Sequence, residues 1–364
     1  MTNPLTYSAT ARRRLIGGVY ALIGVFFASV AMGAGASFYW DDDSGNGRWN
    51  TAINWVGDAL PGNNDDIFFE DDYGTGAESV DLRGNRTVRS VNFDNPTAYT
   101  IDNRRFDFAA ITGTIGINVD ELNGAPASAI DHTINSTVRF QTELTVTNVT
   151  TDVTLAFGGT VNGRNSGDLT IEGGGAVRVD GNVRRVPTIN VNDGTLQLGA
   201  SNVIANSVDM NLGGGTFDTD GFNERVDTLT LSASSTIDMG AGASVLEFSD
   251  SSGVAWTGGA VLTVANWSGN LNGGGTDQLT FGNSSTDLTA TQVAQIRFLN
   301  PAGLPAGTHA ARILASGEIV PVPEPSTVII GSLLVLVGLG DVYRRYRKSK
   351  VAKEEESELD EENA

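Results

Sequence analysis

The sequence predicts an all-β protein, a single-stranded parallel β-helix or solenoid with about 20 residues per coil. Three observations predict it. Short β-prone runs with apolar residues at alternate positions follow one another from about residue 80, separated by Gly, Asn, Asp and Ser. These runs recur at a nearly constant interval. Before residue 327, no long amphipathic helical pattern interrupts them.

The recurrence involves two interleaved sets of strands. One set starts at intervals of 20, 19 and 21 residues, at Leu169, Ile189, Val208 and Leu229. The partner set follows at intervals of 19, 21 and 20 residues, at Val177, Leu196, Phe217 and Ile237. A unit of a few short strands cannot bury its own apolar side, so stacking each coil on the next must close the core. The alternative is a β-sandwich with turns at short intervals.

Residues 37–80 form a tryptophan-rich segment in front of the repeats. Three of the five tryptophans fall between positions 40 and 55, among Asp, Gly and Asn residues that favour turns. We expect them to plug the first open end of the β structure; the alternative is an aromatic platform for sugar rings. Weak calcium candidates lie in the same segment, at Asp41, Asp42 and Asp43. The EF-hand frame fails, because Ile53 stands where the bidentate Glu is required.

The first 36 residues have the organisation of a secretory signal peptide. Arg12, Arg13 and Arg14 precede an apolar run from Leu15 to Ala31, and small residues follow at a cleavage position. Cleavage is expected after Ala36, and the residues that define this site are Ala34, Ala36 and Ser37. The alternative is an uncleaved N-terminal anchor.

The C-terminal region has three parts in a fixed order. A rigid proline segment, 322–327, is followed by an apolar stretch and then by a basic cluster. The stretch from Thr327 to Tyr343 is at the short end of the lengths that suit a membrane-spanning helix. The cluster that would set topology by the positive-inside rule contains Arg344, Arg345, Arg347 and Lys348. The alternative is a buried C-terminal helix.

This tripartite ending resembles the PEP-CTERM sorting signal of bacterial surface proteins, here residues 321–350. The matching motif consists of Val322, Pro323, Glu324, Pro325, Ser326 and Thr327. The resemblance implies processing around Pro-Glu-Pro by a membrane protease-transpeptidase, an exosortase, of which this chain would be the substrate. Two features depart from the pattern: Asp341 lies at the end of the apolar stretch, and an acidic tail, 351–364, follows the basic cluster. We expect this tail to be disordered.

A second resemblance lies within the repeats. The octapeptide 192–199, Asn-Asp-Gly-Thr-Leu-Gln-Leu-Gly, is similar to the autotransporter-associated β-strand repeat of surface β-helices. Residues 81–320 are therefore expected to be the exported passenger. Leu288 to Phe298 is expected to be a short segment that caps the last coil.

Charge and composition limit the partners. Between residues 37 and 320 there are 14 arginines, no lysine and 34 acidic residues, a balance of −20. Such a field repels phosphates and argues against nucleic acid. Without cysteine, neither a disulfide framework nor a thiolate metal site exists, so stability must come from packing and backbone ladders. No cofactor is predicted.

Residues suited to catalysis are few. His132 and His309 are the only histidines, and both are expected to have surface or packing roles. Asp218 and Asp220 could place two carboxylates on one strand face, as a glycosidase needs, but solvated turn residues are the preferred interpretation.

Two classes of function follow. The preferred one is a non-catalytic, exported structural or adhesive protein of the cell surface or extracellular matrix. Its expected partners are the export machinery, an exosortase-type protease, the inner membrane for the anchored precursor, and exopolysaccharide. The alternative is a β-helical polysaccharide lyase or glycoside hydrolase.

Overall fold

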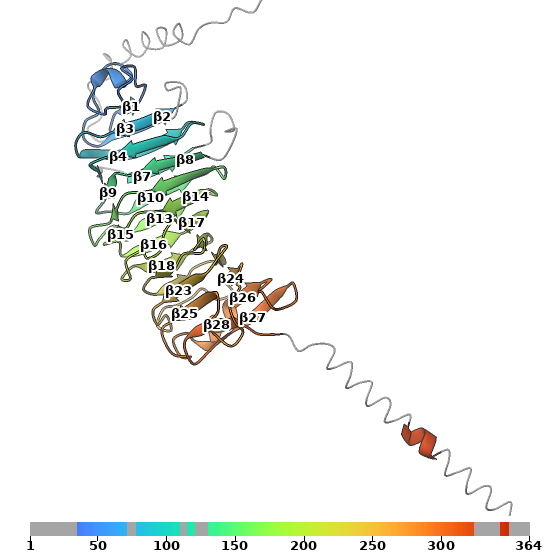
Figure 1. Cartoon of the computed structure of the whole chain (residues 1–364). Helices are drawn as coiled ribbons and strands as arrows, with labels where there is room; N and C mark the ends of the chain where they lie inside the picture. Colours follow the sequence, from blue (N-terminus) through green and yellow to red (C-terminus); the bar gives the residue numbers. More distant parts are fainter. Residues whose placement is uncertain (1–34, 71–77, 110–114, 121–129, 324–342, 349–364) are drawn as a thin grey trace, which may run out of the picture. The chain divides into compact units, whose positions relative to one another are not determined.

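The structure is a computed structural model that describes residues 35–70, 78–109, 115–120, 130–323 and 343–348. The chain divides into two units, Met1–Pro321 and Val322–Ala364. The first unit is a β-solenoid (Figure 1). In the second, residues 343–348 are helical and exposed.

Each full coil of the solenoid places one short strand on each of three faces, and strands of successive coils pair in parallel along a face (Figure 1). Face 1 carries β1 (Ser37–Tyr39), β2 (Asp65–Glu70), β4 (Arg86–Asp94), β7 (Ile115–Val119), β10 (Leu144–Asn148), β13 (Leu169–Glu172), β16 (Thr188–Val191), β18 (Asp209–Leu212) and β21 (Leu229–Leu231). Face 2 carries β3 (Glu78–Asp81), β5 (Tyr99–Asp102), β8 (Ile130–Ile134), β11 (Val153–Phe157), β14 (Ala176–Val179), β17 (Thr195–Leu198), β19 (Thr216–Asp218), β22 (Ser235–Asp238), β24 (Leu262–Ala265) and β26 (Ile296–Leu299).

Face 3 is the least regular. It carries β6 (Arg105–Phe108), β9 (Thr137–Arg139), β12 (Val161–Asn162) and β15 (Val183–Arg184), followed by β20 (Glu224–Arg225), β23 (Ser244–Phe248) and β25 (Asp277–Phe281). The long strand β4 turns the corner between faces 3 and 1, because its first half pairs with β6 and its second half with β7.

Alternation along each strand sends every second side chain into the core, which explains the period-2 pattern of the sequence. Because the coils stack in register, like positions form apolar ladders along a face. On face 2 one such ladder consists of fully buried Leu155, Val177, Leu196, Phe217, Ile237, Val264 and Phe298. Full burial of one such side chain stabilises the fold by about 1.5–3 kcal/mol.

The predicted parallel solenoid is confirmed, and the β-sandwich is wrong, because sandwich sheets pair antiparallel whereas these coils pair in parallel. The partner set keeps the predicted register from Val177 to Ile237. The other set does not keep it at one position. Met210, rather than Val208, pairs with Ile189, because Val208 occupies the turn before β18.

The coil length also varies more than the repeats suggest. On face 2, Ile101 pairs with Ile134 and Leu262 pairs with Ile296, so these coils are much longer than the central ones. The extra residues lie in the connections between strands, which leaves the ladders intact. The regular repeat read from the sequence therefore describes only the central coils.

The N-terminal end of the solenoid is filled by three indoles. Trp40, Trp49 and Trp55 are at most 1% exposed, and Trp55 lies 5.1 Å from Trp40 and 4.7 Å from Trp49 between ring centroids. Trp55 Nε1 donates to the Trp49 carbonyl at 2.9 Å. Because the rings pack against Phe69 and Phe106 of the first coils, they are core residues and are not available as a platform for sugars.

The C-terminal end is closed by an antiparallel hairpin, β27 (Thr308–Ile313) and β28 (Glu318–Pro321). β27 pairs with β26 at the edge of face 2, and β28 pairs with β25 at the edge of face 3. The hairpin thus joins the last strands of two faces. The helix α2 (Ala290–Gln295) lies in the segment expected to be the cap, but β26 continues the parallel ladder, so the closing element is the hairpin.

Candidate functional site

The proline motif begins directly after the last strand of the solenoid. β28 ends at Pro321, Val322 is half-buried and Pro323 is exposed. Glu324, Pro325, Ser326 and Thr327 lie outside the described residues, as does the apolar stretch that follows them. No helix among the described residues is long and apolar enough to cross a membrane.

The basic cluster lies in the helical segment 343–348. Arg344, Arg345, Arg347 and Lys348 are all exposed there.

The expected signal-peptide cleavage position lies at the start of the folded unit. The Ala36 N–H donates to Asp65 Oδ1 at 2.8 Å, and its carbonyl accepts from the Asp66 N–H at 2.9 Å. Ser37 is the first residue of β1. Ala34 lies outside the described residues.

Two of the weak calcium candidates, Asp41 and Asp42, accept hydrogen bonds from backbone N–H groups of the same loop. Asp41 Oδ1 accepts from the Asp43 N–H at 3.3 Å, and Asp42 Oδ1 accepts from the Gly47 N–H at 3.0 Å. Within the part of the chain that the structure describes, no three His, Cys, Asp or Glu side chains gather around one point.

The two acidic residues considered for a glycosidase, Asp218 and Asp220, are linked by a hydrogen bond from a backbone N–H to a carboxylate. Asp218 Oδ1 accepts from the Asp220 N–H at 2.8 Å, and Asp218 Oδ2 accepts from Gln197 Nε2 at 3.0 Å. Burial raises the pKa of Asp218, and Asp238, the residue in register on the next coil, raises it further. Asp220 is an exposed turn residue with φ +47°. Asp220 is thus the solvated turn residue expected, whereas Asp218 is the half-buried last residue of β19.

His132 is a core residue. It is fully buried in register with Leu155, and its ring stacks on Phe93 at a centroid distance of 4.7 Å. Burial lowers the pKa of His132 to about 4, so the imidazole is neutral at pH 7. Nδ1 then accepts from the Tyr99 N–H at 3.2 Å.

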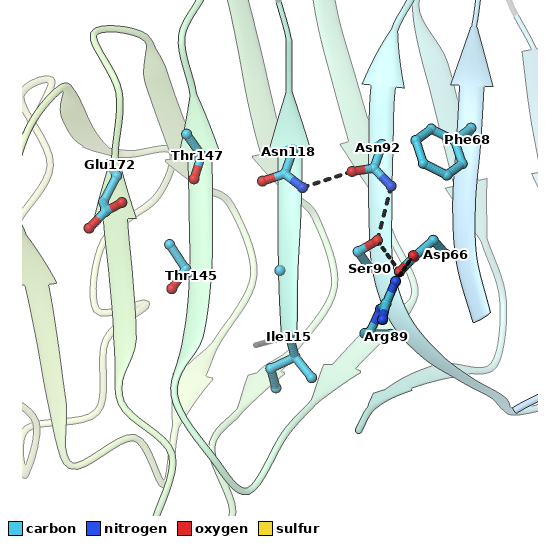
Figure 2. Close-up of a pocket in the computed structure, with 11 residues that line it drawn as sticks. Asp66, Phe68, Arg89, Ser90, Asn92, Ile115, Asn118, Thr145, Thr147 and Glu172 are labelled. Atoms are coloured by element: carbon cyan, nitrogen blue, oxygen red, sulfur yellow. Dashed lines mark hydrogen bonds and ion pairs between the residues drawn. The ribbon is translucent and has the colours of Figure 1, made fainter. Parts of the chain in front are cut away.

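A hollow of about 590 Å³ lies on face 1, over β2, β4, β7, β10 and β13 (Figure 2). Two outward-facing rows of in-register residues line it. The first row consists of Asp66, Ser90, Gly116 and Thr145. The second row consists of Phe68, Asn92, Asn118, Thr147 and Glu172. Gly116 has no side chain, so it leaves room between Ser90 and Thr145.

A continuous hydrogen-bond chain crosses the hollow from β7 to β2 (Figure 2). Asn118 Nδ2 donates to Asn92 Oδ1 at 2.7 Å, and Asn92 Nδ2 donates to Ser90 Oγ at 3.0 Å. Ser90 Oγ donates to Asp66 Oδ1 at 2.7 Å, and Asp66 also forms an ion pair with Arg89. Hydrogen bonding to Asp66 raises the pKa of Arg89.

This geometry suits binding better than catalysis. The Asp66 carboxylate is ion-paired with Arg89 and accepts a hydrogen bond from Ser90, so it is poorly placed to act as a general base. The hydroxyl and amide groups of the rows can donate to and accept from a hydroxyl-rich ligand. Phe68, which stacks on Tyr39 at 4.9 Å, adds an aromatic surface at one end.

The sequence by itself does not reveal this hollow. Its rows belong to coils of unequal length, in which Val91 pairs with Ile117, Ile117 with Val146 and Val146 with Ile171. Because the number of residues between paired positions differs from coil to coil, the sequence does not show that Asn92 lies beside Asn118. The usable signal is the run of polar residues between the buried positions of each strand.

Comparison of the chain with protein-family models, with curated proteins and with solved structures gives no match.

Proposed function

We propose that this chain is an exported bacterial structural or adhesive protein of the cell surface or extracellular matrix, with a C-terminal segment that an exosortase-type protease removes. The observation that carries the proposal is the position of the motif. The folded unit ends at Pro321, and the first proline of Pro-Glu-Pro follows two residues later with its side chain exposed. A protease acting there would release an intact solenoid.

The architecture supports a structural role. Stacked coils give an extended surface, and both ends are closed, by indoles at one end and by the β27–β28 hairpin at the other. Outward rows of hydroxyl and amide groups offer repeated hydrogen-bonding positions to a sugar polymer. In this proposal the precursor is held in the inner membrane by the apolar segment, with the basic cluster on the cytoplasmic side.

The sorting step is tested by replacing Pro323, Glu324 and Pro325 with alanine in the producing bacterium. We expect the precursor to keep its C-terminal segment and to remain in the membrane fraction, because the protease loses its recognition element. Mass spectrometry of the C-terminus of the surface-extracted protein measures the outcome. Pro305→Ala, at an exposed proline in the loop before β27, is the matched control and should be processed normally.

An unchanged C-terminal mass and location in the triple-alanine variant would rule out processing at this motif. The alternative class is tested separately. A polysaccharide lyase would release unsaturated, ultraviolet-absorbing product from uronate polymers, and finding that product would replace the structural proposal with an enzymatic one.

A further inference from the structure

The cationic side chains of this acidic protein are concentrated on one part of its surface. Eight of the 14 arginines between residues 37 and 320 lie on the first half of face 3, up to β15, or at its corners. One of them, Arg86, is half-buried and donates to the Leu82 carbonyl. We name the surface formed by the other seven the arginine face; it comprises Arg83, Arg104, Arg105, Arg139, Arg164, Arg184 and Arg185.

Strand register aligns two of these arginines, Arg139 of β9 and Arg184 of β15, along face 3. In strand register, Asp107 of β6 lies beside Arg139 of β9. Arg139 lies beside Asn162 of β12, and Asn162 lies beside Arg184 of β15. Neighbouring strands are about 4.8 Å apart, so β6 and β15 are separated by about 14 Å. A hollow of about 240 Å³ lies beside β6 and β9, bordered by Asp107, Arg139 and Arg164.

Four of the seven arginines occupy turns with positive φ. The values are +54° for Arg83 and Arg104, +51° for Arg164 and +54° for Arg185. A side chain other than Gly, Asn or Asp is uncommon in this region, and the strained conformation is less favourable than it would be for glycine. Arginine at four such turns, all bordering the same face, points to a role for the side chains themselves.

Most of the positive charge on this face is not neutralised. Asp81 pairs with Arg83, and Asp107 pairs with both Arg105 and Arg139. Arg104, Arg164, Arg184 and Arg185 are exposed, and no carboxylate of the described residues forms an ion pair with them.

The nearest acids at the corner with face 1 are engaged elsewhere. Glu143 accepts from Thr170 Oγ1, and Asp168 accepts from the Thr188 N–H at 3.1 Å. Neither carboxylate forms an ion pair with an arginine of this face.

We propose that the arginine face binds an acidic polysaccharide, a chain that carries carboxylates at regular intervals. Guanidinium groups bind carboxylates through paired hydrogen bonds, and arginines on the successive coils of β6, β9, β12 and β15 can meet successive carboxylates of a linear polyanion. Nucleic acid is the weaker fit for two reasons. The aromatic residues of these strands, Phe106, Phe108 and Phe140, are at most 3% exposed and cannot stack on bases. The net charge of −20 also repels the denser charge of phosphates.

This inference rests on the proposed function, because it names the polymer that an extracellular matrix protein would hold, but it is tested without any sorting step. The full-length unprocessed chain, purified in detergent, is titrated with fluorescent polygalacturonate, with dextran and with duplex DNA. The test variant carries Arg164→Gln, Arg184→Gln and Arg185→Gln. The matched control carries Arg48→Gln, Arg225→Gln and Arg312→Gln, which removes the same charge from exposed arginines outside the arginine face.

We expect the chain to bind polygalacturonate and not dextran, with affinity that falls as salt rises from about 50 to about 200 mM. The test variant should bind at least about tenfold more weakly. The control variant should bind as the natural chain does, and circular dichroism melting should be the same for all three.

Three results would overturn the proposal: no binding to polygalacturonate, an equal loss in both variants, or DNA binding at least as tight as polygalacturonate binding. A failure of sorting in the bacterium would leave these measurements unaffected, so the two proposals fail independently.

Discussion

At the scale of single residues, buried polar side chains in the coils lie where backbone groups at the corners need a hydrogen-bond partner. Asn148 is fully buried, and its amide donates to the carbonyls of Val153 at 2.8 Å and Ala176 at 2.9 Å. Glu224 Oε2 accepts from two backbone N–H groups, at 2.8 and 3.0 Å, although burial raises the pKa of its carboxyl. Such groups satisfy the backbone at positions where the ladder is interrupted.

His132 gives a prediction about pH. Its pKa is about 4 in the folded chain and about 6.5 unfolded, so between these values the unfolded chain binds the extra proton. The contribution of His132 to stability is therefore complete above about pH 6.5 and is lost as the pH falls towards 4, by about 3 kcal/mol in total. His132→Leu should remove this dependence and add a constant loss, because the Tyr99 N–H loses its acceptor.

Urea unfolding of both proteins between pH 4 and pH 7 measures the difference in slope. An identical pH dependence for the natural chain and His132→Leu would contradict the burial of a neutral imidazole.

At the scale of elements, the β27–β28 hairpin covers strand edges that could otherwise pair with other molecules. The last strands of faces 2 and 3, β26 and β25, would present unpaired backbone groups without the β27–β28 hairpin. Glu318 fixes this hairpin to the loop before β25, because the Gly274 N–H donates to its carboxylate at 2.8 Å. Burial raises the pKa of Glu318.

Removing the hairpin should therefore expose two strand edges. A chain of residues 37–306 is expected to form oligomers or aggregates by edge-to-edge pairing, whereas residues 37–321 should be monomeric. Size-exclusion chromatography with light scattering distinguishes the two. A monomeric, folded 37–306 chain would show that the hairpin is dispensable as a cap.

At the scale of the whole solenoid, each coil touches only its neighbours, so stability is close to a sum of coil and interface contributions. The ladder of face 2 is an example, because Phe217 is in register with Leu196 on one side and Ile237 on the other. A disturbance at one coil should remain local.

Phe217→Ala tests this expectation. Loss of a fully buried ring should cost about 3–5 kcal/mol of local stability. Hydrogen exchange should then quicken in β17, β19 and β22, while β5 and β8 keep their protection. Equal loss of protection throughout the solenoid would mean that it unfolds as one cooperative unit.

Sequence alone determined the class of fold and the alternation that fills the core, because an alternating pattern repeated about every 20 residues can bury its apolar side only by stacking. It also contains, as consecutive residues, the proline motif proposed for processing and the basic cluster. It did not determine which outward residues share a surface. Coil lengths differ, so Asn92 and Asn118, or Arg139 and Arg184, become neighbours only through strand register. Only the tertiary structure determines which residues form the face 1 hollow and the arginine face, because both consist of side chains from coils of unequal length.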